Sequence, residues 1–466
     1  MARSWPDRAL AAAAACLSAL IAACGGGGGG GGSAIPGGCS ATNEKSFVLG
    51  AAREWYLFLD LLPATVDTGN YATAEDLLDA LTATARAQNK DRFFSYITTP
   101  AADSSFLQEG QFIGFGFRTR IEGNRLLVPD VFENSPAAQG GLGRGSEITH
   151  VDSGGGYVPV STILLTDPNL EQAFGPPTQG VQRGLRYIRV DGQQFEAVLT
   201  KAIVTIAPVP ANGTAVLTLP ANPSVQVGYV NLRTFISTAE TPLRSAFLQF
   251  RNAGIEYFIL DLRYNGGGLV SIADLIGDLF GRNRLPTDVF ENMRFNANKT
   301  SSDSVRRFMP QDQSVSPVRI AFITTGATAS ASEMVVNSMK PWAEVAIVGS
   351  DTFGKPVGQS AFDLAGCNLR LRLVTFKITN ALNEGDYFDG LAPTVPFACA
   401  AGDDLTRNPW DSAEASTSAA LNWLGTGACG QVMGAPTLPA FRMQADVRLP
   451  QMRRPTPAQD ALPGLF

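Results

Sequence analysis

The spacing of hydrophobic residues divides the chain into three regions of different character. In residues 43–105 apolar side chains recur at helical intervals, so that Trp55 and Phe58 share one face of a predicted helix. Residues 106–205 contain short alternating segments and many glycines, which is typical of a β-rich domain. Residues 220–430 alternate short apolar runs with longer amphipathic ones. This alternation predicts an α/β domain with a largely parallel sheet.

Strands and helices can be assigned in turn along the α/β region. The predicted strands are 227–235, 257–263, 319–324 and 343–349, and the predicted helices are 241–254, 269–281 and 330–340. Ligands of such domains usually bind at the carboxyl ends of the strands. We therefore expect the chemistry in the turns that follow these strands.

The amino-terminal end has the features of an export signal. Arg3 and Arg8 precede an Ala-rich apolar run that is too short to favour a membrane-spanning helix. The run ends in Ile21-Ala22-Ala23-Cys24, which resembles the lipobox of bacterial lipoproteins. The resemblance implies that residues 1–23 are a cleaved signal peptide and that Cys24 carries lipid. A plain secretory signal is the alternative, and either one places the mature chain outside the cytoplasm.

The segments that flank the folded regions read as unstructured. Residues 24–42 are glycine-rich and predict a flexible tether after the lipidated cysteine. In Gram-negative bacteria, an aspartate directly after the lipidated cysteine would keep the lipoprotein from passing to the outer membrane. This chain has Gly25 at that position, which implies the periplasmic face of the outer membrane as the location. Residues 431–466 contain a proline-rich tail that we expect to be disordered.

Net charge and cysteine content restrict the possible partners and the cellular compartment of the protein. The net charge of −6 provides no basic field for nucleic acid. Once the signal and the lipidated residue are set aside, Cys39, Cys367, Cys399 and Cys429 remain, an even number suited to an oxidising compartment. Of the three possible pairings we expect Cys367–Cys399 and Cys39–Cys429, although the sequence cannot choose among them. No spacing of cysteine or histidine predicts a metal site, and no cofactor is expected.

The β-rich region resembles a bacterial PDZ domain. The matching pieces are the loop Gly114-Phe115-Gly116-Phe117, the stretch "SPAAQGGL" and the stretch "GRGSEITHVDS". The resemblance implies that the backbone N–H groups of this loop bind the carboxyl end of a peptide, which adds a strand to the sheet. The alternative is that Gly114 and Gly116 only permit a tight turn. His150, the one histidine of the chain, is most simply a structural or surface residue.

Two strand-to-helix turns suggest ligands but fail as nucleotide sites. "DLRYNGGG", Asp261 to Gly268, lacks the third glycine of a dinucleotide fingerprint, although its glycines suit an anion cradle. "GSDTFGKP", Gly349 to Pro356, almost forms a phosphate-binding loop. Pro356 offers neither the hydroxyl nor the N–H that the last position needs. Nucleotide is therefore not expected as a partner.

A third turn, "TASASE", contains two serines and an acid. Ser330 and Glu333 have the spacing of a capping box, in which each side chain accepts from the other residue's backbone N–H. Taken alone, this turn is a helix start. A nucleophilic serine needs a base, and His150 lies far away in the sequence.

"TASASE" followed by "FGKPVGQ" resembles the carboxyl-terminal processing peptidases, also called tail-specific proteases. The resemblance implies that Ser330 is the nucleophile, Lys355 the base and Gln359 the residue that orients the lysine. It also implies a catalytic domain with the layers of ClpP and crotonase, with a PDZ domain inserted in it or preceding it and a small helical segment at the start. This sequence departs from the family at Gly266, where proline is frequent, and at Pro356, where glycine is common.

The chemistry that the resemblance implies explains how a serine could react without a nearby histidine, because a lysine would serve as the base. A lysine ordinarily has a pKa of about 10.4, so a lysine base must be stripped of water to be neutral. Phe353 and the strand 345–348 are the local candidates for an apolar surround. The N–H groups of Ala331 and Gly267 are the candidates for binding the oxyanion.

We therefore expect a serine endopeptidase with a Ser–Lys dyad, acting on exported proteins near unfolded carboxyl-terminal tails that the PDZ domain recognises. The partners expected are protein or peptide substrates with free carboxyl termini and a lipid anchor in the membrane. Two other readings stay open. One is a non-catalytic peptide-binding lipoprotein on a protease-like fold, and the other is a purely structural envelope lipoprotein.

Overall fold

The computed structural model describes residues 38–434, 447–450, 452 and 454–466. The predicted signal peptide, Cys24 and most of the tether lie outside the described residues. In the part of the chain that is described, no helix is both long and apolar enough to cross a membrane.

The centre of the α/β domain is a six-stranded sheet. Its order is β10 (Thr214–Leu219), β11 (Asn222–Asn231), β12 (Tyr257–Asp261), β15 (Arg319–Thr324), β16 (Glu344–Gly349) and β19 (Phe397–Ala400). The strands from β11 to β19 run parallel, and β10 is antiparallel to β11. The predicted parallel α/β domain is confirmed.

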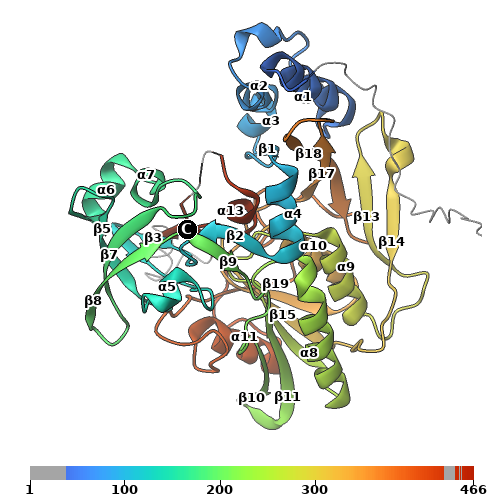
Figure 1. Ribbon diagram of the computed structural model, residues 1–466. Coiled ribbons are helices and arrows are strands. Elements are labelled where there is room, and N and C mark those ends of the chain that lie inside the picture. The colour runs from blue at the N-terminus through green and yellow to red at the C-terminus, as the bar shows by residue number, and fades with distance from the viewer. Residues whose placement is uncertain (1–37, 435–446, 451, 453) are drawn as a thin grey trace, which may run out of the picture. The chain divides into compact units, whose positions relative to one another are not determined.

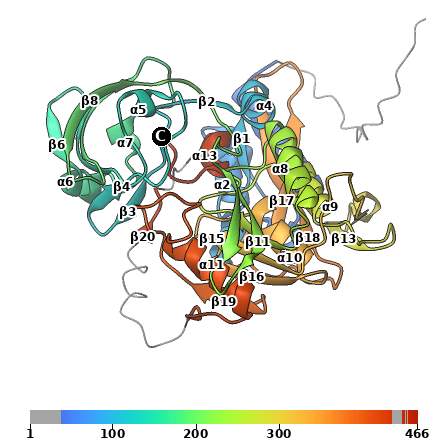
Figure 2. The same cartoon turned by 90° about the horizontal axis from the view of Figure 1, so that it is seen from below.

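Successive residues of these strands point to opposite faces, and each face is covered by helices. On one face Phe258, Leu260 and Phe322 pack with α8 (Glu240–Asn252), α9 (Val270–Leu279) and α10 (Ala331–Met339). On the other, Ile259 and Ile323 pack with α11 (Ala415–Thr426). Figure 2 shows α8 and α9 on one side of the sheet and α11 on the other. The domain is thus layered α/β/α.

A second, five-stranded sheet carries the N-terminal helices. It consists of β1 (Tyr96–Thr98), β18 (Arg370–Thr379), β13 (Val289–Phe295) and β14 (Ser304–Arg307), with β17 (Val357–Asp363) paired to β18. The helices of this part are α1 (Ala41–Trp55), α2 (Ala74–Leu81), α3 (Ala83–Ala87) and α4 (Pro100–Glu109). Val48 of α1 and Leu77 of α2 share a core with Leu371 and Leu373 of β18.

The β-rich module contains most of residues 106–205. Its main sheet has the order β20 (Val447–Arg448), β3 (Arg120–Glu122), β4 (Arg125–Leu127), β5 (Glu147–Asp152), β7 (Gln182–Ile188) and β8 (Gln194–Thr200), with β6 (Tyr157–Pro159) paired to β5. β2 (Gln111–Gly114) pairs with β9 (Ala202–Thr205), and the helices are α5 (Pro136–Gln139), α6 (Val160–Thr166) and α7 (Glu171–Phe174).

The expected disulfide pairing is wrong. The structure joins Cys39 to Cys367 and Cys399 to Cys429. Cys39 lies just before α1, which packs on the β17–β18 hairpin whose turn contains Cys367. Cys429 follows α11 closely, and the chain after it returns to β19, the strand of Cys399. The prediction assumed that one disulfide joins the two ends of the folded chain. In the structure the packing of α1 and α11 decides which cysteines meet.

The expectation of a disordered tail also differs from the structure in its described part. Residues 456–466, called the C-terminal segment below, include α13 (Pro457–Ala461). Leu462, Leu465 and Phe466 are buried. Figure 1 shows α13 and the C-terminal end beside β2 and β3. The proline-rich composition suggested disorder, but these apolar residues pack on other parts of the protein.

Candidate active site

Ser330 stands at the turn between β15 and α10 with an unusual backbone conformation. Its φ is 57° and its ψ is −118°. Ser40 and Thr73, the N-caps of α1 and α2, have ordinary extended backbones with φ of −111° and −124°. A non-glycine residue held at positive φ is a mark of strained functional turns. This backbone distinguishes Ser330 from the caps at Ser40 and Thr73 and makes its turn a candidate functional turn.

Glu333 joins this turn to the lysine loop. One carboxyl oxygen accepts from the N–H groups of Ser330 (2.9 Å) and Lys355 (2.7 Å), and the other accepts from Gly354 N–H (2.7 Å). Burial raises the pKa of Glu333 to about 7, against the opposing effect of these hydrogen bonds. The sequence indicated Glu333 only as a capping residue. Its link to Lys355 was missed because a buried side chain has no sequence mark for its distant partners.

Ser330 and Lys355 line one cavity of about 160 Å³, together with Ala331 and Gln359. Lys355 is only 5% exposed. Its Nζ lies 4.8 Å from the centre of the Phe94 ring and 3.5 Å from Asp460 Oδ2. Sequence analysis missed both neighbours, which come from the N-terminal region and the C-terminal segment.

The N-terminal region therefore holds the lysine loop as well as covering the sheet. Arg92 donates to the backbone oxygens of Phe353 and Gly354, each at 2.6 Å. Phe353, an expected apolar neighbour of the lysine, packs against Phe94 with ring centres 6.0 Å apart. The other expected neighbour, the strand 345–348, lies in the core of the central sheet.

Gln359 differs from its expected role. Its Nε2 donates to the backbone oxygen of Phe94 at 2.7 Å. Among the described hydrogen bonds, none joins Gln359 to the Lys355 amine. Gln359 therefore holds the backbone of Phe94, whose ring lies beside the Lys355 amine.

The expected oxyanion donors are close to Ser330, but one of them is engaged. A Cβ on Gly267 would lie 2.8 Å from the Ser330 Cβ and 3.0 Å from Ala331 N, so the glycine permits a close approach. The Gly267 N–H donates to Asn265 Oδ1 at 2.9 Å, which the sequence did not indicate. Ser332, as expected, points elsewhere and donates to Asn265 O at 3.0 Å. In this state Gly267 does not offer its N–H to an oxyanion.

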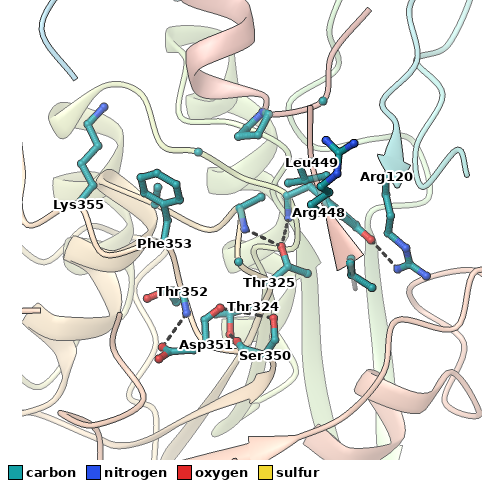
Figure 3. A pocket seen from close by; sticks show the side chains of 18 of the residues that line it. Arg120, Thr324, Thr325, Ser350, Asp351, Thr352, Phe353, Lys355, Arg448 and Leu449 are labelled. Carbon is teal, nitrogen blue, oxygen red and sulfur yellow. Dashed lines mark hydrogen bonds between the residues drawn. The ribbon is translucent and has the colours of Figure 1, made fainter. Parts of the chain in front are cut away.

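Behind Lys355 opens a larger cavity of about 1630 Å³. Figure 3 shows Lys355 and Phe353 at one end of it and Arg120 and Arg448 at the other. The cavity adjoins the C-terminal segment, because Gln459, Asp460 and Leu465 also line it. Ser330 is not among its lining residues, so the smaller cavity is the better candidate for the chemistry.

The predicted peptide-binding loop holds a residue of the chain itself. Gly116 N–H and Phe117 N–H donate to the backbone oxygen of Phe466, at 2.9 and 3.4 Å. Phe466 N–H donates in turn to Phe117 O at 3.0 Å. The side chains of Phe115 and Phe117 are fully buried in the module core, and a Cβ on Gly114 would lie 3.1 Å from Phe466 C. His150 lies on β5 with its ring near the Thr149 hydroxyl, in keeping with a structural role.

The fold and the site together fit the class of serine peptidases. Residues 226–397 match the model of peptidase family S41, and residues 43–96 match that of the peptidase S41 N-terminal domain. These findings support the S41 serine peptidase family for this chain. The region that contains Phe94 thus matches the N-terminal domain of that family.

Individual relatives agree with this family. The "Carboxyl-terminal-processing protease" of Synechocystis sp. is 27% identical over 258 residues, which cover 55% of this chain and 56% of that protein. "Carboxyl-terminal-processing peptidase 3, chloroplastic" of Arabidopsis thaliana is 26% identical over 326 residues, covering 67% of this chain and 59% of that protein. The chain thus spans less than two thirds of the length of these curated relatives.

A solved structure shares the fold. The crystal structure of "Putative S41 protease" from Bacteroides fragilis has a TM-score of 0.63 at 22% identity, covering 82% of this chain and 97% of that one. At this identity the likeness concerns the fold alone.

Proposed function

We propose that the chain is a serine endopeptidase in which Ser330 is the nucleophile and Lys355 the general base. The observation that carries the proposal is the shared cavity: a serine at strained positive φ and a buried lysine line it together. Glu333 fixes their backbones to each other through Ser330 N–H and Lys355 N–H. A nucleophilic serine without a histidine nearby needs another base, and the lysine that lines the same cavity is the candidate.

The reaction then proceeds in two halves. Neutral Lys355 Nζ takes the proton as Ser330 Oγ attacks the peptide carbonyl carbon, and Ala331 N–H, at the start of α10, stabilises the oxyanion. When the C–N bond breaks, Lys355 returns the proton to the leaving amine. Water then attacks the acyl-serine with Lys355 again as base, which releases the acid and restores Ser330.

The β-rich module gives the proposed substrate class. It acts as a PDZ-like domain whose Gly114–Phe117 loop binds the carboxyl end of an unfolded protein by strand addition. The N–H groups of Gly116 and Phe117 already bind a backbone oxygen in this manner, which supports the proposal.

We also propose an exported, lipid-anchored protein, held by Cys24 at the periplasmic face of an outer membrane. The two disulfides in the described residues support a location in an oxidising compartment. Palmitate labelling of the wild type and of Cys24→Ser in a Gram-negative host tests the anchor, and equal labelling would contradict it.

Substrate tails are tested with two matched peptides. A peptide with a free carboxylate and an apolar last residue should be cleaved at a kcat/KM at least about tenfold above that of its terminal amide, because the loop N–H groups bind the carboxylate. Product formation is followed by mass spectrometry. Equal values would remove tail recognition and leave the peptidase, whereas no cleavage of either peptide, or of an unfolded protein, would contradict the peptidase.

Replacing Glu333 should disturb serine and lysine at once. Glu333→Gln places an amide NH2 where an oxygen accepts backbone N–H groups, and a buried unsatisfied donor costs about 1–3 kcal/mol. We expect a lower melting temperature and a fall in kcat/KM of at least about tenfold. The measurements are calorimetry and peptide cleavage. The control is Glu344→Gln, whose side chain is 37% exposed in a surface pair with Arg319.

The same variant has a pH signature. Since burial raises the pKa of Glu333 from 4.5 to about 7, the folded state binds this proton more tightly than the unfolded state does. The contribution of Glu333 to stability is therefore full below pH 4.5 and falls as the pH rises towards 7. Glu333→Gln should lose this part of the pH dependence of the melting temperature, and an unchanged dependence would contradict the assignment.

A further inference from the structure

The C-terminal segment binds the β-rich module as an added strand. Besides the bonds between Phe466 and the Gly116–Phe117 backbone, Gly464 O accepts from Thr119 N–H at 2.8 Å and Leu465 pairs with Arg118 in antiparallel fashion. Main-chain bonds of this kind give affinity without regard to sequence. The groove for a substrate tail is thus occupied by the chain itself.

Side chains of the segment fill apolar pockets. Phe466 is 4% exposed, and its ring centre lies 4.4 Å from that of Phe174 within the module core. Leu462 and Leu465 are buried in a separate cluster with Phe132. A pocket that encloses a phenylalanine ring selects a large apolar residue at this position.

The helical part of the segment reaches the candidate active site. Asp460 Oδ2 lies 3.5 Å from Lys355 Nζ, and Ala461 O accepts from Gly266 N–H at 2.9 Å. This contact engages the Lys355 amine with a carboxylate, whereas a general base must turn its lone pair to the Ser330 hydroxyl. The neighbouring Gly267 N–H is turned to Asn265 at the same time. The site is therefore held in a state unsuited to catalysis.

We infer that residues 456–466 are an intramolecular ligand that keeps the protease inactive until a substrate tail with a large apolar residue takes the place of Phe466 in the module groove. This inference rests on the proposed function. The inference adds the identity of the ligand that competes with the substrate and the chemistry of the substrate tail that displaces this ligand. A ligand on the same chain competes at a high effective concentration, so that only a well-matched tail displaces it.

Two variants of the full chain test the inhibition. Asp460→Ala removes the partner of Lys355, and Phe466→Ala empties the pocket beside Phe174. Each is assayed on an internally quenched peptide amide, which does not compete for the groove. We expect kcat/KM to rise at least tenfold in both, and Asp312→Asn, an exposed aspartate in another loop, to match the wild type. Unchanged kcat/KM in both variants overturns the inference.

A binding assay separates this inference from the proposed function. It uses a fluorescent peptide of residues 456–466 and protein carrying Ser330→Ala, so that no cleavage occurs. The same protein with Phe466→Ala added should bind the peptide at least tenfold more tightly, measured by anisotropy. Equal affinities overturn the inference. If no variant cleaves any substrate, the proposed function fails, and this assay alone decides whether the segment is a ligand.

Discussion

Ser330→Ala and Lys355→Ala should each lower kcat/KM on an unfolded protein by at least about 10³-fold, because nucleophile and base act as one unit. For the same reason the double variant should be no worse than either single one. Cleavage is measured by the release of new amino termini. Binding of substrate tails by the β-rich module should persist in all three variants, since its Gly116–Phe117 loop lies in another part of the fold.

Ser332→Ala is the matched control for Ser330. The Ser332 hydroxyl is buried and donates to Asn265 O, so its loss disturbs the glycine loop without removing a reacting group. We expect a smaller loss of activity than with Ser330→Ala. Melting curves show whether each variant is folded. Cleavage at the wild-type rate by folded Lys355→Ala would rule out the dyad.

Asp403→Asn should be the most destabilising single change of charge. The carboxylate of Asp403 accepts from Arg144 (2.5 Å) and Arg263 (2.7 Å) and pairs with Arg120 at 3.3 Å. Its side chain is only 6% exposed. Removing one partner of a buried ionic cluster costs about 3–5 kcal/mol, and here Arg144 loses its one carboxylate among the described ion pairs. The variant should melt several degrees lower by calorimetry.

The pH dependence gives this prediction a second measurement. Burial alone would raise the pKa of Asp403, but Arg144 and Arg263 outweigh it and hold the pKa well below its usual range. The stabilisation is therefore present above the ordinary pKa of about 3.9 and is lost as the pH falls below it. Asp411→Asn is the control, since Asp411 is 38% exposed in a surface pair with Arg407 and solvent screens such pairs. Equal melting temperatures for the two variants would contradict the role of Asp403.

The sequence was most informative where periodicity alone decides structure. The strands 257–263 and 319–324 were predicted because apolar runs of that length between helical segments fit a buried parallel sheet, and β12 and β15 lie there. Disulfide pairing and the C-terminal segment were not predictable in this way. Both depend on which distant surfaces meet, and local composition carries no record of that.

The site shows the same division. Ser330 and Lys355 stood in recognisable turns, and the structure places both on one cavity. Phe94 and Asp460 lie in segments without any chemical signature, so nothing local marked them as neighbours of the lysine amine. Gln359 was expected to orient the lysine amine; it lines the same cavity, but its Nε2 donates to Phe94 O. Sequence motifs indicated the two residues proposed to react, but not the contacts that Phe94 and Asp460 make with the lysine amine.

The bond between Cys399 and Cys429 has a practical consequence for handling the protein. The loop that it closes contains Asp403 and Glu414, the two acids outside β12 that pair with Arg263. Opening a loop of this length releases chain entropy worth roughly 3–4 kcal/mol to the unfolded state. Thiol reductants in the buffer would thus weaken the anchoring of Arg263, so preparations are best kept free of them.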